Sequence, residues 1–299
     1  MGFRLPLGMA DFAKRGFRLD RPDERAVLER HARSFLAGFN EVTGWRNTHG
    51  VLGQIPDEER GFAYEGAGMR AALHDLVAPA RAAVLPRLLA GPGQRYVHLI
   101  HVGYGWGLVP TRLPVPVRLP ATPLLRWLAL DGAGFAEVFF GGLPALRRRC
   151  GRPATPRQAV RIAGCGRALW FLQCADVAGV AGIIDTVPAE AKPQLWAGAG
   201  LAACYAGGID RAKIDELVAA SGKHEPHLRQ GALFAITARA RSGVVPAHTE
   251  MACRQLFSVG PDVAEGWTDD AARGLAGSAE LSSYMEWKSR LRIAVAHRS

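Results

Sequence analysis

One carboxylate in the sequence lies among neighbours that would change its chemistry. Glu65 is the only acid between Gly61 and Leu73, where the surrounding residues are mostly glycine, alanine, aromatic and other apolar residues. A carboxyl group that is removed from water holds its proton more tightly, so its pKa rises. Such a group can act as a general acid or base. Glu65 is therefore the first candidate for catalysis; the alternative is a buried acid satisfied by an arginine or a helix amide.

The stretch around Glu65 returns later in the chain without its acid. The segment Leu195–Ala203 repeats the glycines and alanines of Gly66–Ala71 at a distance of 132 positions, but Ala197 stands at the position that matches Glu65. A duplicated scaffold that keeps its packing residues in both copies and its carboxylate in only one predicts a separate role for that carboxylate.

Two further acids are candidates for proton transfer. Asp131 and Asp176 each lie in an otherwise apolar helical segment, and both could face a shared interior. Paired carboxylates in such a place could handle protons during a cyclisation. The alternative for these acids is a helix-stabilising ion pair with Arg126 or Arg167.

Two histidines are spaced by one turn of a helix. His98 and His101 could form a proton relay or provide two metal ligands. Two histidines alone do not make a zinc site, and no acid completes an H-E-x-x-H pattern, so we expect no metal. His227 repeats His98 in the second half, which favours a structural role for this position.

Aromatic residues near these polar groups are the expected contacts to a substrate: Tyr64, Tyr104, Trp106 and Trp196. The run Gly103–Gly107 lacks the G-x-G-x-x-G spacing of a dinucleotide site. The sequence also has no G-x-S-x-G elbow and no phosphate-binding loop. We therefore expect no organic cofactor.

Helices are the elements that must position these residues. Apolar residues at helical spacing predict helices over residues 20–42, 55–77 and 124–140, and two more in the tail from Asp262 to Ser299. Tyr96–Val102 has the β-branched and aromatic content of a strand, but its counterpart in the second half is plainly helical, so we predict a helix. The basic run Arg147–Pro153 predicts a solvated connection between two halves.

An internal repeat organises the chain. Four blocks recur in the same order, which argues for duplication. They are Phe35-Leu36 with Phe171-Leu172 at an offset of 136, Pro56 with Pro188 and the glycine-alanine element at 132, His98-Leu99 with His227-Leu228 at 129, and Arg126 and Leu128 with Arg254 and Leu256 at 128. The sequence thus predicts an all-α single domain, residues 1–299, with two halves (about 20–145 and 157–275) about a pseudo-twofold axis and a helical tail, 276–299.

Composition narrows the setting. The five cysteines form no C-x-x-C pair and four lie in apolar surroundings, which indicates reduced core thiols. Residues Met1–Gly8 contain no apolar core of signal-peptide length, so we expect a cytoplasmic protein. The most apolar segment, Ile162–Ile184, carries Arg167 and Asp176 and is better interpreted as a buried helix than as a membrane span.

The net charge of +10 comes mostly from arginine. A basic surface could attract nucleic acid, a membrane face or an acidic protein such as an acyl carrier. No zinc finger, helix-turn-helix spacing or aromatic-basic RNA signature accompanies the charge, so nucleic acid is not the expected partner.

Four segments together resemble the UnbL-like family, whose members are encoded beside enediyne polyketide synthases: Arg60–Ala67, His98–Trp106, Leu124–Gly132 and Leu195–Leu201. The likeness covers roughly Phe12 to Leu291. It implies a role in making or maturing the enediyne core from the polyene that the synthase releases, and it transfers no catalytic residue. One departure is Gln173-Cys174, where Glu-Gly is expected in such relatives.

Two hypotheses follow for the function. In the first, the protein is an enzyme without organic cofactor that guides cyclisation, isomerisation or oxidation of a hydrophobic polyene or enediyne intermediate. In the second, it is a non-catalytic binder or assembly partner, which shields the polyene or docks through its arginines on the synthase's acyl carrier domain. Glu65 is the residue that separates them. The sequence leaves open whether the chain forms a homodimer.

Overall fold

The described residues of the chain fold into helices without strands. The structure is a computed structural model, and it describes residues 4–42, 46–77, 84–109 and 119–296. The predicted all-α class is confirmed. The helices are α1 (Phe12–Arg15), α2 (Pro22–Glu41), α3 (Thr48–Leu52), α4 (Asp57–Val77), α5 (Val84–Leu89), α6 (Val97–Trp106), α7 (Leu128–Cys150), α8 (Pro156–Leu172), α9 (Val177–Asp185), α10 (Lys192–Ala206), α11 (Arg211–Ser221), α12 (Glu225–Ser242), α13 (Ala247–Phe257), α14 (Pro261–Ala272) and α15 (Leu281–Ala296).

Local sequence signals explain where several helices begin. Pro22 is the first residue of α2 and is followed by two acids in the first turn, as the positive end of a helix favours. The Thr155 hydroxyl accepts a hydrogen bond from the Gln158 amide at 3.2 Å and so caps α8. Asp210 caps α11 in the same way. Tyr96–Val102 contributes to α6, so the helix predicted there is correct.

The basic run is only partly a solvated loop: Gly151–Pro153 lie between α7 and α8, and Arg147 and Arg148 are exposed. Arg147–Arg149 form the last turn of α7, and the loop follows only after Cys150. Arg149 is buried and donates to Glu137 from Nε at 2.6 Å and to the Gln158 side chain at 3.0 Å. A carboxylate within reach makes this arginine part of the fold, which composition alone did not reveal. α7 is itself interrupted at Gly142, whose φ of 59° is not helical.

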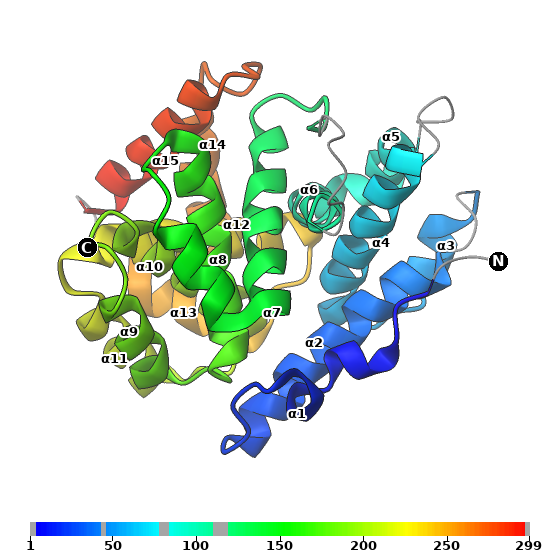
Figure 1. The fold of residues 1–299 in the computed structure, drawn as a ribbon. Helices are drawn as coiled ribbons and strands as arrows, with labels where there is room; N and C mark the ends of the chain where they lie inside the picture. The colour runs from blue at the N-terminus through cyan, green and yellow to red at the C-terminus, as the bar shows by residue number, and fades with distance from the viewer. Residues whose placement is uncertain (1–3, 43–45, 78–83, 110–118, 297–299) are drawn as a thin grey trace.

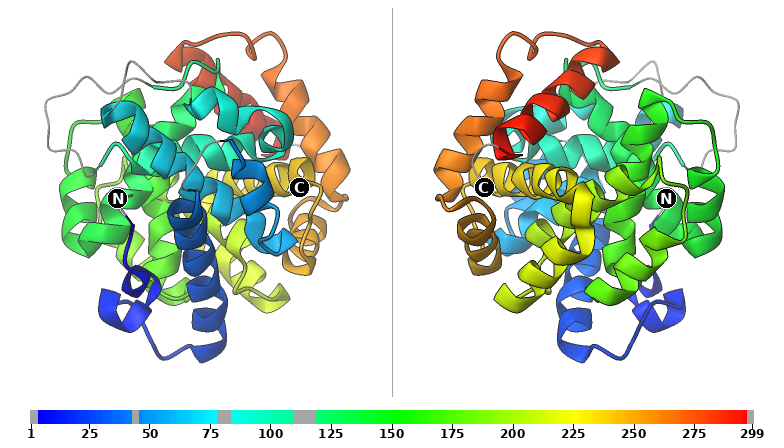
Figure 2. Two further views of the ribbon diagram at one scale, coloured as in Figure 1. Left: turned by 90° about the vertical axis from the view of Figure 1, so that its right-hand side faces the viewer. Right: turned by 90° about the vertical axis from the view of Figure 1, so that its left-hand side faces the viewer.

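A series of helices gives the fold its shape. Each of α2, α4, α6, α7, α8, α10 and α12 contacts the next in this order, and α2 also contacts α10. The helices therefore enclose a common interior. α14 and α15 pack on α12, and all views place α15 at the opposite end of the molecule from α1 (Figures 1 and 2).

Glycines bring the backbones of neighbouring helices into direct contact. A Cβ added to Gly103 on α6 would lie 1.8 Å from the carbonyl oxygen of Glu65 on α4. A Cβ on Gly132 of α7 would lie 1.8 Å from the Val102 carbonyl oxygen. Only a residue without a side chain fits at such contacts. The spacing of these helices is thus fixed by their backbones.

The same backbone contacts occur twice in the chain. They are Gly38 on Ala63 and Gly166 on Leu195, Gly66 on Phe35 and Gly198 on Ala163, and Gly103 on Glu65 and Gly231 on Ala197. They align α2 with α8 and α6 with α12 at an offset of 128, and α4 with α10 at 132. The sequence had paired α2 with α8 at 136. Eight residues are about 2.2 helical turns, so the apolar faces overlap only in part under that shift. The sequence had paired α6 with α12 at 129, one residue from the offset of these contacts. The duplication and the division into halves stay predictions.

All five cysteines are buried free thiols.

In the described part of the chain, no helix has both the length and the apolar character that a membrane crossing requires.

Candidate functional site

An aromatic cavity occupies the interior that the helices enclose. α2, α4, α6, α7, α8, α10, α12 and α15 all contribute to its walls. The cavity has a volume of about 90 Å³ and is the narrow part of a hollow of about 1060 Å³ that includes the open mouth. The void is therefore narrow relative to its extent and suits a thin molecule. Aromatic walls include Phe35, Phe62, Trp106, Phe135, Phe139 and Phe171.

Two of the predicted acids meet in this cavity on one arginine. Arg167 of α8 donates from Nη1 to Oδ1 of Asp131 at 2.5 Å and from Nη2 to Oε1 of Glu65 at 3.3 Å. All three side chains line the cavity and are less than a tenth exposed. The ion pair between Asp131 and Arg167 is one of the alternatives that the sequence left open. The Arg167 guanidinium therefore contacts the carboxyl groups of both Asp131 and Glu65.

Burial controls the titration of these acids. It raises the pKa of Glu65 above its ordinary value, although the Arg167 charge and the hydrogen bond from Trp106 oppose the rise. It raises the pKa of Asp131 in the same way, again against Arg167. A carboxyl group with a raised pKa keeps its proton at a higher pH and can give it to a bound molecule.

Trp106 fixes one oxygen of Glu65 and leaves the other free. The indole Nε1 donates to Oε1 at 3.0 Å, the same oxygen that Arg167 reaches. Within the described residues, no donor contacts Oε2. Trp106 was predicted as a substrate contact, and it does line the cavity.

The two histidines of α6 have different positions. His98 lines the cavity, and burial lowers its pKa to about 3, with smaller effects from Arg241 and His101. Its Nδ1 has no hydrogen-bond partner among the described residues. His101 is fully buried outside the cavity lining and bonds through Nδ1 to the Val97 carbonyl oxygen at 2.7 Å. The two rings therefore do not share the cavity.

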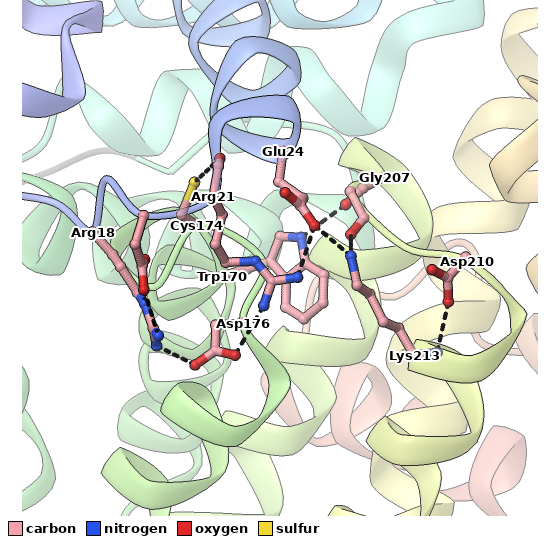
Figure 3. Close-up of polar contacts among 11 residues, drawn as sticks. Arg18, Arg21, Glu24, Trp170, Cys174, Asp176, Gly207, Asp210 and Lys213 are labelled. Atoms are coloured by element: carbon pink, nitrogen blue, oxygen red, sulfur yellow. Dashed lines mark hydrogen bonds and ion pairs between the residues drawn. The ribbon is translucent and has the colours of Figure 1, made fainter.

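Asp176 lies outside the cavity, at the start of α9. It caps that helix by accepting from the Gly179 amide at 2.7 Å, and it is paired with Arg18 and Arg21. Figure 3 shows it between the two arginines. Asp176 and Asp131 therefore do not share an interior as expected. Asp176 caps α9, and its charge is paired with Arg18 and Arg21 of the N-terminal segment.

The remaining predicted aromatic residues pack elsewhere. Tyr64 stacks on Tyr96 with ring centroids 4.3 Å apart, and its hydroxyl bonds to Nδ1 of His49 at 2.9 Å. Tyr104 belongs to the same buried hydrophobic cluster as Tyr64 and Tyr96, and Trp196 is buried in the larger hydrophobic core. None of the three lines the cavity. Successive helix residues point about 100° apart, so Tyr64 turns away from the cavity that Glu65 reaches.

Tyr205 is a cavity residue that the sequence did not single out. Its hydroxyl is buried and has no hydrogen-bond partner among the described residues. A Cβ on Gly61 would lie 2.1 Å from this hydroxyl oxygen, one turn of α4 before Glu65. Burial raises the pKa of Tyr205 to about 12, so the phenol stays protonated and can donate to a ligand. Gly61 was the available signal, because its lack of a side chain makes room for the phenol.

Lys288 of α15 was also missed. It is 2% exposed and donates to the Gln194 side-chain oxygen at 2.9 Å. Burial lowers its pKa to about 8, and the Asp131 charge opposes this shift. Asp131 is thus influenced by two cations, Arg167 and Lys288. Glu65 contacts only one cation, Arg167, and at a longer distance.

No group of three or more histidine, cysteine, aspartate or glutamate side chains is placed to bind a metal within the part of the chain that the structure describes. Comparison of the chain with curated proteins and with solved structures gave no match. A family profile does match, over residues 3–295. The chain therefore belongs to the family described as protein of unknown function (DUF1702).

Proposed function

We propose that the protein binds a hydrophobic polyene or enediyne-type intermediate in the aromatic cavity and isomerises or cyclises it by proton transfer from Glu65. The observation that carries the proposal is the buried carboxyl pair on Arg167 at the wall of an apolar cavity. The likeness of the sequence to proteins encoded beside enediyne synthases supports the choice of ligand class.

Glu65 is the proton donor in this proposal. Asp131 has the closer contact to Arg167 and lies within the influence of Lys288, so it is the acid that ionises first. Glu65 then keeps its proton, and its Oε2 is the oxygen left for a ligand. Arg167 and Trp106 stabilise the carboxylate that forms when the proton leaves.

The reaction needs no further reagent. Glu65 gives its proton to one carbon of the conjugated chain, which becomes a delocalised cation. The aromatic rings of Phe135, Phe171 and Trp106, which line the cavity, stabilise that cation. Loss of a proton from another carbon to the Glu65 carboxylate moves a double bond. Attack by a second double bond before that loss closes a ring. In both cases the enzyme returns to its starting protonation state.

Binding is tested first. Diphenylhexatriene, an uncharged polyene whose fluorescence rises in apolar surroundings, is titrated into the protein. We expect a saturable rise, and expect Ala235→Trp, which fills the cavity wall, to abolish it. Native mass spectrometry and solvent extraction of purified protein then identify any ligand that remains bound. Absence of both diphenylhexatriene binding and a co-purified apolar compound would contradict the proposal.

Chemistry is tested with the extracted compound in D2O. Reversible proton transfer puts deuterium on its carbons, which mass spectrometry detects. Glu65→Gln, which keeps the shape of the side chain, is expected to lower the exchange rate about 100-fold or more. Glu286→Gln, an exposed acid on α15, is the matched control. Equal exchange in both variants would leave a binding protein without this chemistry.

A further inference from the structure

A second hollow opens on the surface beside the cavity, and its floor contains a buried cation. Residues of α2, α4 and α12 and the chain after α10 line this surface cleft. Arg239 of α12 lies in the lining and is only 2% exposed. His31 belongs to the lining of both the cleft and the aromatic cavity, so the two spaces adjoin at this side chain.

Arg239 has no carboxylate partner among the described residues. Its two hydrogen bonds go to backbone carbonyl oxygens, from Nη1 to Glu58 and from Nη2 to Tyr205, both at 2.7 Å. The Tyr205 ring lies 4.0 Å from its guanidinium carbon. Three of its five N–H donors remain, and Nε is buried without an acceptor in the described part of the chain.

Other buried arginines are treated differently. Arg149 is paired with Glu137, and Arg167 with Glu65 and Asp131. An arginine cannot lose its proton in a protein, so a buried one is costly without an anion. The carbonyl of Tyr205, near the end of α10, offsets part of this cost through the negative end of the helix. It does not supply a full charge.

The two histidines in the cleft lining supply no negative charge to Arg239. His248 bonds through Nε2 to the Tyr205 carbonyl oxygen at 3.3 Å, and burial together with the Arg239 charge lowers its pKa to about 4. Both nitrogens of His31 face acceptors, the Glu59 carboxylate at 2.9 Å and the Ala206 carbonyl oxygen at 2.8 Å.

Two of the four acids that line the cleft have partners of their own. Glu24 is held by Arg21 and Lys213, as Figure 3 shows, and Asp210 caps α11. Although burial alone would raise it, the hydrogen bonds from Arg21 and Lys213 hold the pKa of Glu24 at about 2. These acids therefore do not neutralise Arg239, while exposed Asp23 and Glu58 face water.

We propose that Arg239 binds the carboxylate of an amphipathic ligand whose apolar chain occupies the aromatic cavity. The inference rests on the proposed function for the chain-binding part, and adds the chemical class of the ligand: a polyunsaturated carboxylate held at one end by the cleft floor. The ligand passes His31, and its far part lies near Glu65. The carboxylate supplies the anion that Arg239 lacks.

The test compares three probes on the complete protein by fluorescence titration: parinaric acid, its methyl ester and diphenylhexatriene. The acid and the ester share one polyene chain, so their difference measures the carboxylate. We expect wild-type protein to bind the acid about 10-fold or more tightly than the ester, as expected of a charge-assisted hydrogen bond. Arg239→Gln removes this preference and leaves the diphenylhexatriene affinity unchanged.

A matched variant guards against effects on folding. Arg229→Gln makes the same charge change on α12, away from the cleft, and is expected to keep the preference for the acid. The wild-type comparison needs no variant at all. Equal affinity for acid and ester, with diphenylhexatriene still bound, would overturn the carboxylate site and leave the cavity proposal standing. Failure of all three probes to bind would overturn both.

Discussion

The guanidinium of Arg167 on α8 binds Oε1 of Glu65 on α4, although 102 residues separate them in the chain. Asp131 on α7 shares the same guanidinium. Three helices that line the cavity are thereby joined by one buried charge cluster. The cluster is both a structural contact and the candidate chemical centre, so stability and function are expected to respond together when it is changed.

Replacing Arg167 should destabilise the protein strongly. Arg167→Met leaves two buried acids without their cation, and we expect a loss of about 3–5 kcal/mol in the free energy of unfolding. Urea denaturation measures it. Arg273→Gln, which removes an exposed arginine paired with Asp270, should change stability by less than about 0.5 kcal/mol. The combination of Arg167→Met with Glu65→Gln and Asp131→Asn should recover much of the loss. Equal losses of unfolding free energy in Arg167→Met and Arg273→Gln would show that the buried cluster does not stabilise the fold.

The raised pKa of Glu65 predicts a pH dependence of stability. Over the range between its ordinary value and its folded value, the folded protein holds a proton that the unfolded chain has released. The stabilisation from this proton is present at low pH and is lost as the pH rises through the folded pKa. Glu65→Gln removes this titration. From about pH 4 upward, the unfolding free energy of the wild type should therefore fall relative to that of the variant. A difference that does not vary with pH would place an ordinary carboxylate at position 65.

His98 should act in the opposite direction. Its folded pKa of about 3 lies below the ordinary value of 6.5, so the unfolded chain takes up a proton that the folded protein refuses. Stability is full above about pH 6.5 and falls as the pH drops toward 3. His98→Gln should flatten this part of the stability profile, measured by urea unfolding between pH 4 and 7. An unchanged slope in the variant would mean that His98 is protonated in the folded state.

The contact between α6 and α4 should tolerate no side chain at Gly103. Gly103→Ala puts a methyl group onto the Glu65 backbone, so α6 must move away, at a cost of about 3 kcal/mol or more. Gly266→Ala in α14 meets nothing within 4 Å and should stabilise the protein by about 0.5–1 kcal/mol through helix propensity. Thermal unfolding of both variants gives the comparison. A neutral Gly103→Ala would show that the helices can separate freely.

The helices were predictable from sequence because their signals are local. Pro22 with its following acids and the spacing of apolar residues placed α2 and α4, and the repeat settled α6 as a helix. Arg149 was wrongly predicted to be solvated because its partner, Glu137, comes near it only after α7 has folded. Local composition cannot show a contact of this kind.

The candidate site was partly predictable. Glu65 and Asp131 stood out as isolated acids among apolar residues, and both line the cavity. Tyr64 and Trp196 carried no information on which helix face turns inward, since their surroundings are apolar on all sides. Arg239 gave no signal at all, because a missing counter-ion is visible only when the neighbours from other helices are in place.

The glycine contacts have a consequence for how such a protein can change over generations. Because backbone rather than side chains sets the distance between the helices, residues that face the interior can be exchanged without moving the scaffold. The residues that determine which ligand fits and the glycines that set the helix spacing can then be selected separately. A lineage that keeps Gly66, Gly103 and Gly132 can acquire a new ligand by altering a few aromatic rings.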